Sequence, residues 1–275
     1  MIPPGEQMGD KESGQISANA AEVYDQIYLP ALFAEWSFRV LDAAQIQMGQ
    51  RILDVACGTG VLAKTIFEQI GDEGSVVGVD NNEGMLAIAR KKAPQIEWIQ
   101  APAEKLPLED ENFDIVVSQF GLMFFEDKKT ALKEMFRVLR PNGNIVIVVW
   151  DSIKNIPGFA AENQLWQRLF GDESVDEVPY SLGEQRTLKQ LFSSANIFNM
   201  NIQAQHGTAR FPSIKIWMDA GVKGWAQDDL INDRQYELLL KEAEQEFAHF
   251  VKSDGSVAFP TQAHIVTASK PADSE

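Results

Sequence analysis

Residues 50–150 alternate short apolar runs with amphipathic segments, and this alternation constrains the fold more than any other feature of the chain. The apolar runs are rich in valine and isoleucine, which favour strands, and they read RILDVA, SVVGVD, IEWIQ, FDIVVSQF and NIVIVVW. Between them, residues 60–70, 83–92 and 128–140 place apolar residues at helical spacing. Strands that alternate with helices form a parallel sheet covered on both faces. We therefore predict a doubly wound α/β layer over residues 50–150.

The segment before this layer is expected to contain two parts. Residues 1–17 are polar and rich in glycine, proline and serine, so we predict a mobile N-terminal arm. Residues 18–44 have a helical pattern that is dense in aromatic residues. We expect Pro30 to break this helical run into two pieces.

The segment after residue 150 is less regular. Its expected elements are helices over 158–170 and 187–197, a strand over 198–211, a helical region over 213–251 and a final strand over 255–270. A helical insertion just before a final strand is most simply a cap over the sheet. We predict cap insertions at about 151–184 and 213–254.

Charge and cysteine content narrow the class of partner and the compartment. The chain of 275 residues carries 40 acids and 24 Lys and Arg residues, a formal net charge of −16, whereas a phosphate-binding surface needs bases in excess. We predict no nucleic-acid partner. The one cysteine, Cys57, cannot form an internal disulfide, and no stretch approaches the roughly 18 apolar residues that span a membrane. With no signal-peptide pattern at the N-terminus, these features predict a cytoplasmic protein without stable membrane insertion.

The turn ACGTG after the first strand suggests a nucleoside-binding site. Gly58 and Gly60 lack side chains that would keep a ligand from the backbone, and the following helix start attracts anionic groups. Asp80 stands 20 residues beyond Gly60, at the end of the second strand, where an acid accepts hydrogen bonds from ribose hydroxyls. The stretch GTGVLA also satisfies the G-x-G-x-x-A dinucleotide fingerprint, so an NAD(P)-dependent oxidoreductase is an alternative that this spacing does not exclude.

Four ordered motifs resemble those of class I S-adenosylmethionine-dependent methyltransferases: ILDVACGTG, VVGVD, APAEKLPLEDENFDIVVSQFGLMFF and EMFRVLRPNGNIVIVVW. They are most similar to the small-molecule branch that includes the ubiquinone and menaquinone biosynthesis methyltransferases. The resemblance implies a Rossmann-like, seven-stranded, mostly parallel sheet with an antiparallel last strand and a helical cap. It also implies one methyltransferase domain over residues 18–275, in which residues 18–44 form a lid and residues 50–150 the nucleoside-binding core.

The resemblance also implies roles for individual residues around bound S-adenosylmethionine. Asp80 would bind the ribose, Asn81 and Met85 would flank the adenine, and Gln119 would lie where cofactor and acceptor meet. The loop beside the methionine part of the cofactor would consist of residues 54–60, with Asp54, Ala56, Cys57, Gly58 and Gly60 as the candidates. Ala103 would meet the adenine edge. The family usually has an aspartate before this alanine, whereas this chain has Pro102, so Glu104 is a candidate to replace that contact.

Methyl transfer from a sulfonium is an in-line displacement, so alignment and exclusion of water matter most and an obvious catalytic base need not exist. We leave the catalytic residues unassigned and predict no metal, because no His, Cys or Asp cluster has metal-ligand spacing. A non-catalytic S-adenosylmethionine-binding protein is therefore a second alternative. The acceptor is expected to be a small, rather apolar metabolite that is methylated on oxygen, nitrogen or carbon. A homodimer is left open.

Aromatic residues are the candidates for the acceptor side. They are Tyr24, Tyr28 and Trp36 in the lid and Trp150 at the end of the fifth strand, and their faces can attract a sulfonium. Packing between cap and core is an equal alternative for each of them. Trp217 and Trp225, in the later insertion, are further candidates for the acceptor pocket. His249 is expected at the surface, and structural roles are expected for His206 and His264.

Overall fold

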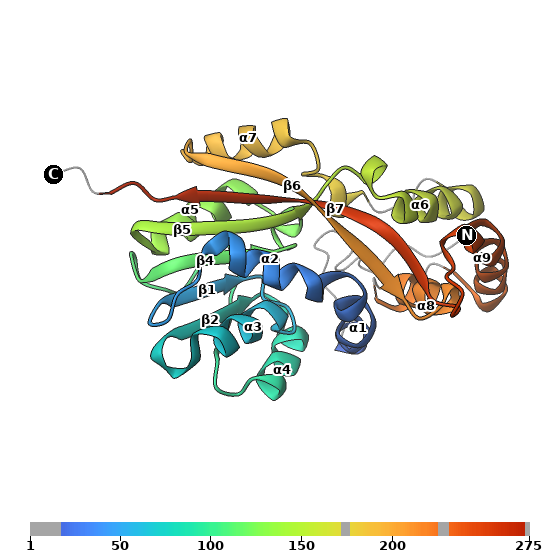
Figure 1. Ribbon diagram of the computed structural model, residues 1–275, viewed down its shortest axis with the longest axis horizontal. Helices are drawn as coiled ribbons and strands as arrows, with labels where there is room; N and C mark the ends of the chain where they lie inside the picture. The colour runs from blue at the N-terminus through green and yellow to red at the C-terminus, as the bar shows by residue number, and fades with distance from the viewer. Residues whose placement is uncertain (1–17, 172–176, 225–230, 273–275) are drawn as a thin grey trace, which may run out of the picture.

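The computed structural model describes residues 18–171, 177–224 and 231–272, which form one seven-stranded sheet with helices on both faces and a helical cap (Figure 1). The strand order is β3-β2-β1-β4-β5-β7-β6. The strands are β1 (Arg51–Val55), β2 (Ser75–Asp80), β3 (Glu97–Gln100), β4 (Phe113–Gln119), β5 (Leu139–Trp150), β6 (Met200–Phe211) and β7 (Val257–Ser269). The first five strands are parallel, and β7 runs antiparallel to β5 and β6. The predicted sheet is confirmed.

The strand order places β1 and β4 side by side at the centre of the sheet, with Ile52 opposite Ile115 and Asp54 opposite Val117. Chain order runs outward from this pair in both directions, through β2 and β3 on one side and β5 on the other. Ligands of open α/β sheets bind at such a switch point, outside the carboxyl ends of the strands. Because β1 and β4 are buried on both faces, each contains a continuous apolar run, Ile52–Leu53 in β1 and Ile115–Val117 in β4.

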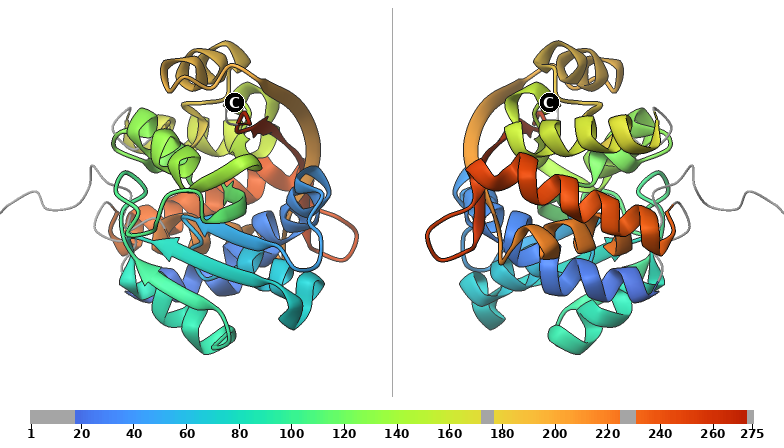
Figure 2. Two further views of the ribbon diagram at one scale, coloured as in Figure 1. Left: turned by 90° about the vertical axis from the view of Figure 1, so that its left-hand side faces the viewer. Right: turned by 90° about the vertical axis from the view of Figure 1, so that its right-hand side faces the viewer.

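Helices cover both faces of the parallel sheet. Helices α2 (Ala34–Ala44) and α3 (Val61–Ile70) pack together on one side, and α5 (Lys128–Val138) lies on the other with α7 (Gln185–Ser194) packed against it (Figure 2). Side chains cap two helix starts. The Asn82 side chain accepts from the Met85 N–H at the start of α4 (Glu83–Lys92), and Asp127 accepts from the Thr130 N–H at the start of α5. Such caps satisfy N–H groups that have no partner within a helix.

The N-terminal helical run differs from the prediction at Pro30. Helix α1 (Ala18–Val23) continues into a π-helical segment, η1 (Tyr24–Phe33), and then into α2 without a break. Pro30 lies inside η1, so its expected role as a break is wrong. In a π-helix the backbone bonds reach back five residues, as the Ala34 N–H does to the Leu29 carbonyl. This wider turn accommodates a proline that would clash with the carbonyl four residues earlier in an α-helix.

The cap consists of α6 (Pro157–Phe170), α8 (Ile214–Gly224) and α9 (Asp233–Glu246), with the long strands β6 and β7 leading into it (Figure 1). In Figure 2, viewed from the cap side, α6, α9 and α1 lie one above another. The centre of the cap is aromatic, and Trp217 stacks near Phe247 and Phe259 with ring centroids 4.8 and 4.7 Å apart. This packing joins α8 to β7 and to the turn after α9.

A carboxyl group lies inside this aromatic cluster. Glu162 is 9% exposed, and its Oε2 accepts a 2.8 Å hydrogen bond from Trp217 Nε1. Burial raises the pKa of Glu162 from 4.5 to about 8, and the Trp217 bond opposes that shift. Because the folded protein holds this proton more tightly than the unfolded chain, the free energy of unfolding decreases as pH rises from the unfolded to the folded pKa.

Replacing Glu162 with glutamine tests this description. The amide still accepts from Trp217 but never ionises, so Glu162→Gln is expected to unfold at a higher temperature than the wild type at mildly alkaline pH. Relative to the variant, the wild type loses at most about 1.4 kcal/mol of unfolding free energy for each pH unit between the unfolded-state and folded-state pKa of Glu162. Thermal unfolding across that pH range measures it, and Glu244→Gln on the exposed face of α9 is the control. Parallel pH profiles for the wild type and Glu162→Gln would contradict the buried-proton interpretation.

Candidate functional site

A cavity of about 370 Å³ opens at the carboxyl ends of β1, β2 and β4. It lies at the switch point of the sheet and beneath η1. Of the residues that the sequence singled out, those lining it are Tyr24, Ala56, Gly58, Asp80, Asn81, Met85, Pro102, Ala103, Glu104 and Gln119. The structure therefore brings together most of the predicted cofactor residues, although they come from four separate segments that follow or end β1, β2, β3 and β4.

The two glycines of the turn have different surroundings. Both have left-handed backbone, with φ of +54° at Gly58 and +82° at Gly60. A Cβ on Gly58 would meet one atom, Tyr24 Cε1 at 4.0 Å, so the space on its pocket side is open. A Cβ on Gly60 would lie 2.5 Å from Cη2 of Trp98, and one on Gly78 would also strike that ring. Gly58 therefore leaves room for a ligand, whereas Gly60 leaves room for the indole.

Trp98 is a site residue that sequence reasoning missed. It lies on β3, donates from Nε1 to the Ala93 carbonyl at 2.9 Å, and supports the glycine loop from behind. The indole fits only because positions 60 and 78 are both glycine. Gly78 could have indicated this packing from the sequence, because a glycine inside a strand often marks the close approach of another group.

Asp54 and Cys57 are close to the cavity without lining it. The Asp54 carboxylate is buried and accepts a 3.1 Å hydrogen bond from the Ala63 N–H, in the first turn of α3. Burial raises the pKa of Asp54, and the Ala63 N–H opposes this shift. Burial also raises the pKa of the Cys57 thiol, which favours the unreactive protonated form. Asp54 thus joins β1 to α3.

Asp80 joins the first two loops of the sheet. Its Oδ2 accepts from the Gly58 N–H and its Oδ1 from the Asn82 N–H, both at 2.8 Å. Burial raises the pKa of Asp80, and the Asn82 and Gly58 donors oppose the shift. Each carboxylate oxygen has a second acceptor position, and the side chain lines the cavity. Asp80 can therefore bind a pair of ligand hydroxyls while it holds the glycine loop in place.

The wall beyond Asp80 consists of two facing segments. Met85 lies in the first turn of α4, which the Asn82 side chain caps at 3.1 Å. Ala103 and Pro102 form the opposite segment, and Pro102 offers no side-chain acceptor. Glu104 Oε1 accepts from the Asp127 N–H at 3.3 Å, so one of its oxygens is already engaged. Met85, Pro102 and Ala103 give this part of the cavity an apolar lining beside the carboxyl groups of Asp80 and Glu104, which suits a base attached to a ribose.

Gln119 ends β4 at the centre of the cavity. Its Nε2 donates to the Phe33 carbonyl at 3.2 Å, which fixes the orientation of the amide. The other amide atom, Oε1, is buried and has no hydrogen-bond partner among the described residues. Buried polar atoms are normally satisfied, so Oε1 is an acceptor available to a ligand.

Five aromatic side chains line the cavity: Tyr24, Phe33, Phe120, Phe124 and Phe125. The sequence identified Tyr24 and missed the four phenylalanines, although FGLMFF after the fourth strand concentrates three of them. No Lys, Arg or His side chain is among the described lining residues, whereas Asp80, Glu104 and Glu126 are. The cavity therefore favours cationic or neutral ligands.

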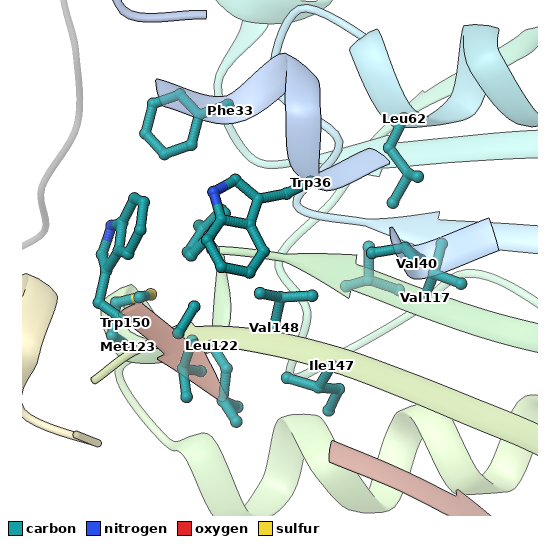
Figure 3. Close-up of a cluster of buried hydrophobic side chains, with 14 of the residues drawn as sticks. Phe33, Trp36, Val40, Leu62, Val117, Leu122, Met123, Ile147, Val148 and Trp150 are labelled. Atoms are coloured by element: carbon teal, nitrogen blue, oxygen red, sulfur yellow. The ribbon is translucent and has the colours of Figure 1, made fainter. Parts of the chain in front are cut away.

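The other aromatic candidates lie in the packed core rather than at the cavity surface. Trp36 is fully buried, and Trp150 stacks on Phe120 with ring centroids 4.0 Å apart. Trp36 and Trp150 pack against each other next to Phe33 (Figure 3). Tyr28 packs edge-on against Phe211, whose ring stacks with Trp217 in the cap. Trp217 belongs to the aromatic cluster of the cap, and Trp225 lies outside the described residues.

The residues present fit S-adenosylmethionine. Gly58 has open space on its cavity side, Asp80 has free acceptor positions, and aromatic faces with an excess of acids suit a sulfonium. In the described part of the chain, no group of three or more His, Cys, Asp or Glu side chains is placed to hold a metal ion. Fold and site together define a class I methyltransferase.

Comparison with known proteins gives the family. The model of the ubiE/COQ5 methyltransferase family matches residues 15–205, and the chain belongs to this family. A demethylmenaquinone methyltransferase of Staphylococcus epidermidis is 30% identical over 208 residues, covering 69% of this chain and 86% of that protein. A ubiquinone/menaquinone biosynthesis C-methyltransferase of Serratia proteamaculans is 39% identical over 119 residues, covering 41% of this chain and 47% of that protein.

A solved structure supports the same fold. The phosphoethanolamine N-methyltransferase 2 of Haemonchus contortus, in complex with S-adenosyl-L-methionine, superposes with a TM-score of 0.59 at 16% identity. It covers 93% of this chain, and this chain covers 57% of it. The protein is thus an S-adenosylmethionine-dependent methyltransferase that acts on a small molecule, as the motifs predict. The oxidoreductase alternative finds no support.

Substitution of Asp80 tests the cofactor site. Asp80→Ala removes the acceptor for ligand hydroxyls and releases the Gly58 N–H, so affinity for S-adenosylhomocysteine is expected to fall roughly tenfold or more. Because the pKa of Asp80 is raised, wild-type affinity is expected to decrease on acidification at a higher pH than an ordinary carboxyl would cause. Asp80→Asn should remove this pH dependence. Calorimetric titration measures both effects, and unchanged binding by Asp80→Ala would show that the cofactor lies elsewhere.

The two glycines allow a matched comparison. Alanine at either position is strained by the positive φ, at a cost of about 1 kcal/mol or more. Gly60→Ala also drives a Cβ into Trp98, so it is expected to lower the melting temperature more than Gly58→Ala does. Gly58→Ala places its methyl group on the ligand side and should lose more cofactor affinity relative to its loss of stability. Partial recovery of the melting temperature in Gly60→Ala/Trp98→Leu would identify the indole as the cause, and the absence of recovery would contradict it.

Proposed function

We propose that the protein methylates a ring carbon of an uncharged, flat aromatic metabolite of the hydroquinone class, with S-adenosylmethionine bound in the cavity at the switch point. The observation that carries this proposal is the composition of the cavity wall. It combines five aromatic rings with no basic side chain among the described lining residues. A flat, neutral ring matches such a wall, whereas a phosphate or carboxylate next to it would have no cation to pair with.

The proposal assigns the two ends of the cavity to different parts of the ligands. Asp80 would bind the ribose, Met85 and Ala103 would enclose the adenine, and Gly58 would lie against the methionine part. The rings of Phe120, Phe124 and Phe125, on the other side of Gln119 along the chain, would form the acceptor wall. When bound, the cofactor supplies an electrophilic methyl group on its sulfonium.

The chemistry of the acceptor agrees with this wall. Ring hydroxyl groups donate electron density to the neighbouring ring carbon, which makes that carbon nucleophilic. The enzyme then has to align the ring and exclude water, as aromatic packing does. The relatives named above are a demethylmenaquinone methyltransferase and a quinone C-methyltransferase, which supports carbon over oxygen or nitrogen as the methylated atom.

The remaining assignments are part of the same proposal. We propose that nucleic acid is not a substrate, which the net charge of −16 supports. In the described part of the chain no helix has the length and apolarity to span a bilayer. The cytoplasmic location stays a prediction, supported by the single free cysteine, and the homodimer stays a prediction as well.

An acceptor series tests the proposal. The purified enzyme is given S-adenosylmethionine with reduced demethylmenaquinone, the same ring with both hydroxyls methylated, and a ring that carries a carboxylate. Formation of S-adenosylhomocysteine is expected with the first, little with the second and least with the third. Phe124→Ala should raise the KM for the acceptor and leave cofactor affinity unchanged. Equal turnover of the carboxylate-bearing ring, or turnover of none of the three, would contradict the proposed acceptor class.

A further inference from the structure

The π-helical segment η1 brings two aromatic residues to the cavity that an α-helix would separate. Tyr24 and Phe33 are nine residues apart, which in an α-helix of 3.6 residues per turn places them on opposite faces. At about 4.4 residues per turn, the wider π-helix places them on nearly the same face. Their rings are 5.3 Å apart and stacked at 26°, and both line the cavity. The π register therefore determines which rings cover the site.

The two ends of η1 are each fixed by a side chain from the sheet layer. At its end, the Phe33 carbonyl accepts from Gln119 Nε2. At its start, Asp25 Oδ1 lies 2.6 Å from Lys92 Nζ, and Lys92 is the last residue of α4. Tyr24 directly precedes Asp25 of the ion pair, and Phe33 itself provides the carbonyl that binds Gln119. Helix α1, which precedes η1, also packs against α4.

The ion pair between Asp25 and Lys92 is better shielded than most pairs on this surface. Its side chains are 19% and 33% exposed, whereas those of the Lys154–Glu184 pair are 63% exposed or more. Shielded pairs are screened less by salt and water. Without Lys92, the Asp25 carboxylate, which is 19% exposed, would be a poorly hydrated charge without its partner. Moving toward water would carry the start of η1, and Tyr24 with it, away from Gly58.

We propose that Asp25 and Lys92 are positioning residues for the cofactor: their ion pair holds the Tyr24 ring over Gly58 and thereby sets the affinity for S-adenosylmethionine. This inference rests on the proposed cofactor site. The ion pair acts through Tyr24 and makes no contact with the ligand itself. Neither residue lines the cavity.

The test combines charge removal, charge reversal and a double-mutant cycle, with the S-adenosylhomocysteine dissociation constant measured by calorimetry. Asp25→Asn and Lys92→Met are each expected to weaken binding about fivefold. The reversed pair Asp25→Lys/Lys92→Asp should recover most of that loss. Lys154→Met, which breaks the exposed pair far along the chain, is the matched control and should bind as the wild type does.

The cycle with Tyr24 separates positioning from a purely structural role. Tyr24→Leu alone should weaken binding, and adding Asp25→Asn to it should change the dissociation constant less than twofold. If Asp25→Asn weakens binding equally with and without the Tyr24 ring, the pair does not act through Tyr24 and the proposal is wrong. Full affinity in Asp25→Asn also overturns it. Full affinity in Tyr24→Leu would instead show that the cofactor is not bound beneath η1, which contradicts the proposed site itself.

Discussion

The hydrogen bond from the Gly58 N–H to the Asp80 carboxylate is the interaction on which the site depends. It ties the loop after β1 to the end of β2, two segments that the parallel sheet brings side by side. Asp80 also accepts from Asn82, whose own side chain caps α4 and thereby places Met85. One carboxylate thus fixes the glycine loop and the start of α4 beside it. Its burial makes this arrangement sensitive to protonation.

Two further side chains, Trp98 and Asp54, support the glycine loop after β1. The Trp98 ring occupies the space that Gly60 and Gly78 leave, and Asp54 holds the first turn of α3. These contacts make the glycine loop a rigid surface rather than a flexible one, which suits a reaction that requires alignment more than proton transfer. The three glycines around this loop therefore serve two purposes: Gly58 opens space for a ligand, whereas Gly60 and Gly78 leave room for the Trp98 ring.

The cap and the N-terminal helices have a different physical character from the sheet. The sheet core is aliphatic and its central strands β1 and β4 are buried on both faces, whereas the cap is held by aromatic stacking around a carboxyl group whose pKa is raised by burial. The aromatic side chains that line the cavity come from η1 and from the segment after β4. The rings of the candidate site thus lie outside the strands themselves, as is common where loops on a rigid scaffold carry function.

The sequence alone determined the parallel layer and the order of its elements and indicated a candidate nucleoside site, because strand and helix periodicity and the glycine–acid spacing are local properties of the chain. Gly58 and Asp80 were singled out in this way, whereas Met85 and the antiparallel last strand came from the family resemblance. Only the tertiary structure decided which aromatic rings face the cavity. Trp36 and Trp150 are buried behind Phe33 and Phe120, and no local pattern distinguishes a ring that lines a cavity from one that packs a core. The π register through Pro30 was likewise hidden, because it depends on packing against the sheet and on contacts with Lys92 and Gln119, which are remote in sequence.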